Sequence, residues 1–99
     1  MFSIYASPLA IATYQQNIEF LEERWAKKEV VNFIKKVSDV IYILKISPQT
    51  FQKWSKDNTI HKIEIVKQIT LYYQINSKNV ELLLFFNNLQ DPVLLQKLL

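Results

Sequence analysis

The side chains that could act on a phosphate group lie in one stretch of the chain. His61, Lys62, Lys67 and Tyr72 supply an imidazole, two ammonium groups and a phenol. Such groups move protons and stabilise developing negative charge in phosphate chemistry. These four residues are the catalytic candidates of the sequence. For His61 and Lys62 the favoured interpretation is that they are ordinary polar side chains at the start of a strand, and a catalytic role is the alternative.

A β-sheet must position these side chains, because residues 60–92 alternate apolar and polar residues with the period of two that is typical of strands. We expect three strands in an antiparallel meander. One face of the last two strands is expected to carry Ile69, Leu71, Tyr73, Ile75, Val80, Leu82, Leu84 and Phe86. The other face is expected to carry Thr70, Tyr72, Gln74, Glu81, Leu83, Phe85 and Asn87.

The turn between these two strands sets their expected register. If Ser77 and Lys78 are the two loop residues, every apolar residue of the middle strand faces an apolar partner. The expected pairs are Ile75 with Val80, Tyr73 with Leu82, Leu71 with Leu84, and Ile69 with Phe86.

This register has two consequences for the candidate residues. His61 falls on the opposite face of the sheet from Lys62 and Tyr72, which divides the phosphate cluster. Tyr72, Leu83 and Phe85 make the second face apolar as well, so that face must be covered or bind a partner.

The rest of the chain predicts an α+β fold in which residues 1–99 form a single domain. Residues 1–5 alternate like an edge strand. Ser7 and Pro8 mark the start of a helix, and a second helix follows Trp25 and ends before Pro48. The two helices are expected to pack as a hairpin on one face of the sheet.

Residues 47–54 are interpreted as a short connector rather than as a DNA-recognition helix. After Pro92, an apolar tail must dock on the domain; its residues are Val93, Leu94, Leu95, Leu98 and Leu99.

Composition excludes several classes of site. The chain has no cysteine and one histidine, which argues against a metal site, and no glycine, which argues against a phosphate-binding glycine loop. We therefore expect no metal and no cofactor. The net charge is +3, and eleven of the twelve cationic residues are lysines, which attract acidic partners without bidentate recognition. No signal peptide or membrane span is recognisable, so we expect a cytoplasmic protein.

Four segments resemble motifs of one protein family, and one of them, residues 47–49, stands where members carry a short proline-containing connector. Residues 5–10 are similar to an "SPLA" entry into the first helix, and residues 18–25 to an aliphatic pair followed by acidic residues and tryptophan. Residues 71–75 with 82–92 are similar to the ending "LYYRI … ILxFWDNRQDP". The sequence therefore resembles the RelE/ParE superfamily, the toxins of bacterial type II toxin–antitoxin pairs, and most closely its ParE-like branch. The resemblance implies a strand, a helical hairpin and a three-stranded meander.

The chain departs from the family at three positions. His61, Gln74 and Leu89 stand where many members carry arginine. RelE-like members cut messenger RNA on the ribosome with basic and aromatic side chains, so the missing arginines weaken that interpretation. ParE-like members inhibit DNA gyrase by binding.

The resemblance implies a growth-inhibiting toxin, of a type used in plasmid stabilisation, that binds a cognate antitoxin in a hetero-oligomer. We expect the ParE-like activity, with DNA gyrase as the target. The alternatives are a RelE-like endoribonuclease acting at the ribosome and a decayed toxin fold kept as an interaction module. The residues expected to bind antitoxin or target are Tyr72, Leu83, Phe85, Gln90 and Asp91.

Overall fold

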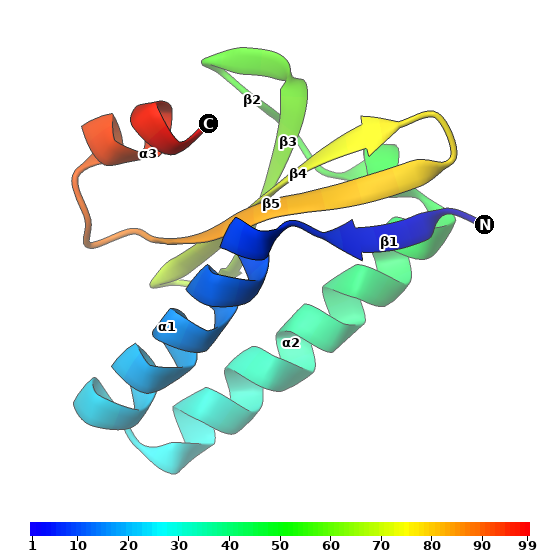
Figure 1. Cartoon of the computed structure of the whole chain (residues 1–99). Helices are drawn as coiled ribbons and strands as arrows, with labels where there is room; N and C mark the ends of the chain where they lie inside the picture. The colour runs from blue at the N-terminus through cyan, green and yellow to red at the C-terminus, as the bar shows by residue number, and fades with distance from the viewer.

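Five strands form one sheet in the order β1-β5-β4-β3-β2 in the computed structural model, which describes residues 1–99 (Figure 1). The elements in chain order are β1 (Ser3–Ala6), α1 (Pro8–Arg24), α2 (Lys27–Ile46), a 3-10 turn (Pro48–Thr50), β2 (Lys53–Trp54), β3 (Asp57–Val66), β4 (Ile69–Asn76), β5 (Asn79–Asn87) and α3 (Pro92–Leu98). The predicted α+β architecture is confirmed. The sheet is mixed, because β1 runs parallel to β5 while the other pairs are antiparallel.

The helical hairpin covers one face of the sheet, as predicted (Figure 1). Ser7 caps α1 by accepting a hydrogen bond from the Ala10 backbone N–H at 3.0 Å, and Pro8 occupies the first helical turn. Both features are strong helix-start signals. The core between hairpin and sheet includes Phe33 and Leu44 from α2 and the strand residues Ile65, Ile69, Leu71, Tyr73, Val80, Leu82 and Phe85.

The register between β4 and β5 agrees with the prediction only near the turn. Ile75 pairs with Val80 and Tyr73 with Leu82, as expected. A β-bulge between Tyr73 and Tyr72 then leaves Leu83 without a partner and pairs Leu84 with Tyr72. The expected partners Leu84 for Leu71 and Phe86 for Ile69 are therefore wrong; the observed partners are Phe85 and Asn87.

The bulge exchanges the faces of the residues that follow it, because a shift of one residue reverses the direction of every side chain. Phe85, expected on the outer face, packs beneath the helices against Tyr14 and Phe33. Leu84 and Phe86, expected beneath the helices, lie on the outer face with Tyr72. Leu71 and Leu84 thus belong to opposite sides of the sheet.

The outer face is covered by the chain itself, so of the two predicted possibilities, an intramolecular cover or a bound partner, the structure shows the cover. Trp54, Ile60, Tyr72, Leu84, Phe86 and Leu95 form a second buried cluster there, and Leu83 packs against it. Leu95 comes from α3, which lies across the sheet from the helical hairpin (Figure 1). The predicted docking of the apolar tail is thus confirmed, with Leu95 as the buried residue of α3.

Beyond the end of β1, polar side chains of Ser7 and of α1 bond the edge of β5. Ser7 donates its hydroxyl to the Leu83 carbonyl at 2.8 Å. Thr13 accepts from the Phe85 N–H at 2.9 Å, and Asn17 donates to the Phe85 carbonyl at 2.9 Å. Buried backbone groups must be bonded, so these three side chains replace a neighbouring strand. They fix α1 against the sheet.

No helix of the structure combines the length and apolar character that crossing a membrane requires.

Candidate functional site

The structure separates the four residues proposed for phosphate chemistry. His61 pairs with Tyr73 and Lys62 pairs with Tyr72 in the β3–β4 ladder, so the predicted division between the two faces is confirmed. Lys67 is exposed in the turn between these strands, at the far end of the ladder. The four side chains do not converge on a common point.

His61 is a buried residue of the helical side. Its ring stacks on Tyr73 with centroids 5.2 Å apart, and 8% of the residue is exposed. Its Nδ1 atom is buried without a hydrogen-bond partner. Burial, with a smaller effect of the Lys53 ammonium, lowers the pKa of His61 below its ordinary value. A neutral imidazole packed on a tyrosine ring is what this environment favours.

Tyr72 is also buried, on the outer face. Its ring meets the Trp54 ring edge to face with centroids 5.6 Å apart, and burial raises the pKa of its phenol. Tyr73, its neighbour, donates its hydroxyl to the Pro48 carbonyl at 2.6 Å. Both tyrosines therefore hold the strands to the connector formed by residues 47–54.

The positions that carry arginine in similar toxins also lie apart. Gln74 donates its amide to the Thr59 hydroxyl at 3.0 Å across β3 and β4. Leu89 is 72% exposed, beyond the end of β5. With His61 on the helical side, these three positions form no basic cluster. No group of three histidine, cysteine, aspartate or glutamate residues is placed to hold a metal ion.

The residues proposed to bind an antitoxin or target do not form one surface. Tyr72 and Phe85 are buried on opposite sides of the sheet. Leu83 is half-buried at the bulge. Asp91 caps α3 by accepting from the Val93 N–H at 2.9 Å. Gln90 lines a groove and remains a candidate for contact with a ligand.

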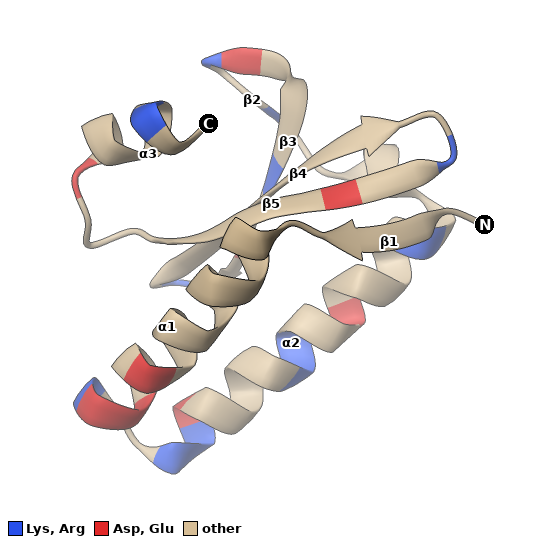
Figure 2. Ribbon diagram, viewed as in Figure 1, with Lys and Arg blue, Asp and Glu red and all other residues tan.

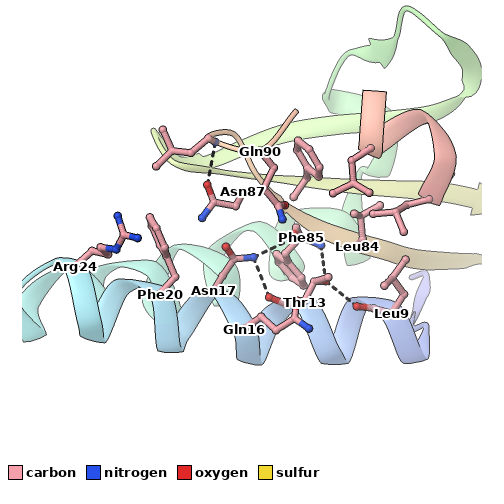
Figure 3. Close-up of a pocket in the computed structure, with 14 residues that line it drawn as sticks. Leu9, Thr13, Gln16, Asn17, Phe20, Arg24, Leu84, Phe85, Asn87 and Gln90 are labelled. Atoms are coloured by element: carbon pink, nitrogen blue, oxygen red, sulfur yellow. Dashed lines mark hydrogen bonds between the residues drawn. The ribbon is translucent and has the colours of Figure 1, made fainter. Parts of the chain in front are cut away.

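Two grooves flank α1, and sequence reasoning missed both. The first, the α1–α3 groove, has a volume of about 550 Å³ and lies between α1, the end of β5 and α3 (Figure 3). The second, the α1–α2 groove, has a volume of about 380 Å³ and is almost wholly apolar. Ile11 and Ile34 border it and are 62% and 43% exposed. The sequence contained one signal for the α1–α2 groove: α2 carries more apolar residues around its circumference than a single buried stripe requires.

No protein-family model and no curated protein sequence matches the chain. Solved structures do. The chain superposes on a structure of the chromosomal ParDE TA system from P. aeruginosa with a TM-score of 0.71 and 10% identity, covering 88% of this chain and 96% of the other. A YoeB/ParE toxin from Agrobacterium tumefaciens matches with a TM-score of 0.60, 11% identity and coverages of 88% and 99%. A YoeB dimer from Staphylococcus aureus matches with a TM-score of 0.59, 15% identity and coverages of 82% and 90%.

These likenesses agree with the resemblance found in the sequence motifs. The superpositions with the ParDE structure and the YoeB/ParE toxin cover 88% of this chain and 96% and 99% of the other chains, so the likeness extends over nearly the whole fold. At these identities the similarity is one of fold. The chain therefore has the fold of the RelE/ParE superfamily of toxins.

Proposed function

We propose that the chain is the toxin of a type II toxin–antitoxin system. The observation that carries this proposal is the fold, shared with a ParDE system at a TM-score of 0.71 and with YoeB proteins at about 0.6. The sequence motifs of residues 5–10 and 71–92 support it independently, because they are similar to the ParE-like branch.

We further propose that the toxin acts by binding a target, as ParE-like members do, rather than by cutting RNA. His61 and Tyr72 are buried on opposite faces, and Lys67 lies at a distant turn. General acid–base catalysis requires side chains within hydrogen-bond reach of the same reacting group. The arrangement therefore favours inhibition by binding, with DNA gyrase as the first target to examine.

Two assays with the purified chain distinguish these activities. In the first, DNA gyrase supercoils a relaxed plasmid in the presence of increasing chain, and we expect inhibition. In the second, ribosomes translate a defined messenger RNA whose cleavage is mapped by primer extension. Cleavage that depends on the chain would identify the RelE-like alternative. Absence of growth inhibition on expression would identify a decayed fold.

An antitoxin partner is part of the proposal. Two of the similar structures are complexes of YoeB with YefM from Staphylococcus aureus. On this chain we assign antitoxin binding to the α1–α2 groove, because Ile11 and Ile34 expose apolar surface beside it. Apolar grooves between helices are a common docking site for an amphipathic helix.

Co-expression with the product of the neighbouring gene tests this surface. We expect the two proteins to co-purify and growth to be restored. Ile34→Asp should abolish co-purification, because it places a charge in the groove. Val93→Asp is the matched control, since Val93 is exposed on α3 away from the groove. Equal loss with both variants would contradict the assignment of the surface.

A further inference from the structure

The side of α2 that faces away from the sheet carries a row of exposed apolar residues. Val31, Tyr42 and Ile46 are 56%, 64% and 54% exposed. Eleven and four residues separate them, which is close to three turns and one turn of an α-helix, so they line up along one side. The buried residues of α2 occupy the opposite side; they are Phe33, Val37 and Leu44. Single exposed apolar residues are ordinary, whereas a row of them along one element is a candidate contact surface.

Four lysines lie along the same side of the helix. They are the exposed residues Lys27, Lys28, Lys35 and Lys45. At about 100° per residue, each of them lies within about 40° of Val31 or Tyr42. Figure 2 shows basic residues at both ends and in the middle of α2. We call this side the α2 outer face; it is defined by Lys27, Lys28, Val31, Lys35, Tyr42, Lys45 and Ile46.

Few carboxylates offset the charge of this face. The helix contains five lysines and two acidic residues, Glu29 and Asp39. Lys35 Nζ bonds Asp39 Oδ2 at 3.1 Å, and this is the only ion pair in the structure. Glu22 and Glu23, at the end of α1, therefore make no ion pair with the lysines that begin α2. The α2 outer face is cationic, and three of its four ammonium groups have no carboxylate partner.

The combination of charge and apolar side chains decides between the possible occupants. A second copy of the chain is disfavoured, because two cationic faces repel each other. Single-stranded nucleic acid is bound by aromatic stacking platforms and arginine, whereas this face has one aromatic residue, Tyr42, and no arginine. The surface of an anionic bilayer matches both properties. Its phosphate groups attract lysines, and its interfacial region accepts aliphatic and aromatic side chains.

We propose that the α2 outer face binds the surface of a bilayer that contains anionic lipids. The helix lies parallel to the bilayer plane over its length of about 30 Å. Val31, Tyr42 and Ile46 enter the headgroup region, where aromatic side chains such as tyrosine are enriched in membrane proteins. The lysine stems extend beside them and place the ammonium groups at the lipid phosphates. This contact needs no segment that spans the bilayer.

The proposed membrane contact is separate from the α1–α2 groove and does not depend on toxin activity. Ile34 is 43% exposed and lies beside both surfaces, so the test variants leave it unchanged. A failure of membrane binding would thus leave the assignment of the antitoxin surface intact.

Co-sedimentation of the purified chain with lipid vesicles tests the proposal. One set of vesicles contains phosphatidylcholine alone, and in the other about a third of the lipid is phosphatidylserine. At an ionic strength of about 0.1 M, we expect the partition coefficient to be at least about tenfold higher for the anionic vesicles. The coefficient should fall as added salt screens the charges.

Two double variants separate the α2 outer face from the overall charge of the chain. Lys28→Gln with Lys45→Gln should lower the partition coefficient about 25-fold, because each lysine near an anionic surface contributes about fivefold. Lys56→Gln with Lys97→Gln is the matched control. It removes the same charge from exposed positions in the β2–β3 turn and in α3, which lie across the sheet from the helical hairpin (Figure 2). The control should change the coefficient by less than about twofold.

Val31→Ser with Tyr42→Ser measures the apolar contribution, since it leaves every charge in place. It should lower the partition coefficient at least about fivefold. Circular dichroism establishes that each variant is folded.

The proposal is overturned if the chain does not prefer anionic vesicles, or if the control pair weakens binding as much as the pair on α2. It is also overturned if Val31→Ser with Tyr42→Ser binds as tightly as the unmodified chain, because the contact would then involve charge alone. A labelled single-stranded RNA that displaces the chain from the vesicles would identify nucleic acid as the occupant and would likewise overturn it.

Discussion

Asn17 joins α1 to the last strand through one amide group. Its Nδ2 bonds the carbonyl groups of Thr13 and Phe85. Asn17→Ala would leave the Phe85 carbonyl without this partner, and an unsatisfied buried polar group costs about 1–3 kcal/mol. We expect the free energy of unfolding to fall by that amount in urea denaturation. Gln16→Ala, at an exposed position one residue earlier, should change it by less than about 0.5 kcal/mol.

His61 should make stability depend on pH. Burial and Lys53 lower the pKa of His61 in the folded state, so the unfolded chain binds more protons near and below its ordinary pKa of about 6.5. Stability is therefore full above about pH 6.5 and falls as the pH drops below that value. Urea denaturation at about pH 7.5, 6.5 and 5.5 measures the effect.

His61→Phe is the control for this dependence, because it keeps an aromatic ring beside Tyr73 and removes the titrating group. The chain has one histidine, so no second imidazole contributes in this range. Between about pH 7.5 and pH 5.5, we expect the free energy of unfolding to fall less for His61→Phe than for the unmodified chain. An equal loss in both proteins would show that His61 is not responsible.

At the scale of elements, α3 is held to the sheet by few side chains. Leu95 is its one buried residue and belongs to the outer cluster with Trp54 and Phe86. Leu95→Ala should destabilise the chain by about 2 kcal/mol, near the lower end of the range for buried leucine, because α3 is short and can relax. Val93→Ala, at an exposed position of the same helix, should cost less than about 0.5 kcal/mol.

A dye that fluoresces on apolar surface gives a second measurement for this variant. If α3 detaches, the outer cluster is exposed and the dye should bind Leu95→Ala more strongly than Val93→Ala. Unchanged stability together with unchanged dye binding would show that α3 does not cover the outer face in solution.

The sequence predicts the positions of most helices and strands but not the β-bulge. Period-two alternation located β4 and β5, and the Ser7–Pro8 pair located α1, because these signals are local. The bulge at Leu83 has no local signal in a chain without glycine, since Leu82, Leu83 and Leu84 are chemically identical. Which of them faces the helices is decided by contacts with α1, where Thr13 and Asn17 bond Phe85. An error of one residue therefore placed Leu84, Phe85 and Phe86 on the wrong faces.

The candidate site was predictable to a smaller extent. Parity along β3 and β4 separated His61 from Tyr72 correctly. The α1–α3 groove was not predictable, because it depends on where α3 docks after the Pro92 break and on the angle of α1. Gln90 was named as a binding residue from its motif alone, and the structure places it in this groove.

At the scale of the whole molecule, β5 completes the fold. It pairs with β1 on one side and β4 on the other, and it contributes Val80, Leu82 and Phe85 to the core beneath the helices. Because β1 and β5 lie at opposite ends of the sequence, their parallel pairing closes a loop of most of the chain. Such pairing forms late, since the entropy of loop closure must first be overcome.

Cleavage at the β4–β5 turn tests this dependence. Residues 76–79 of that turn are exposed, so dividing the chain between Ser77 and Lys78 cuts it at the surface. We expect residues 1–77 alone to lack cooperative unfolding, because α1, β1 and β4 then have no common partner. Mixing with residues 78–99 should restore a cooperative transition and the far-ultraviolet circular dichroism of the intact chain. Cooperative unfolding of residues 1–77 alone would show that the helices and β3–β4 form a stable unit without β5.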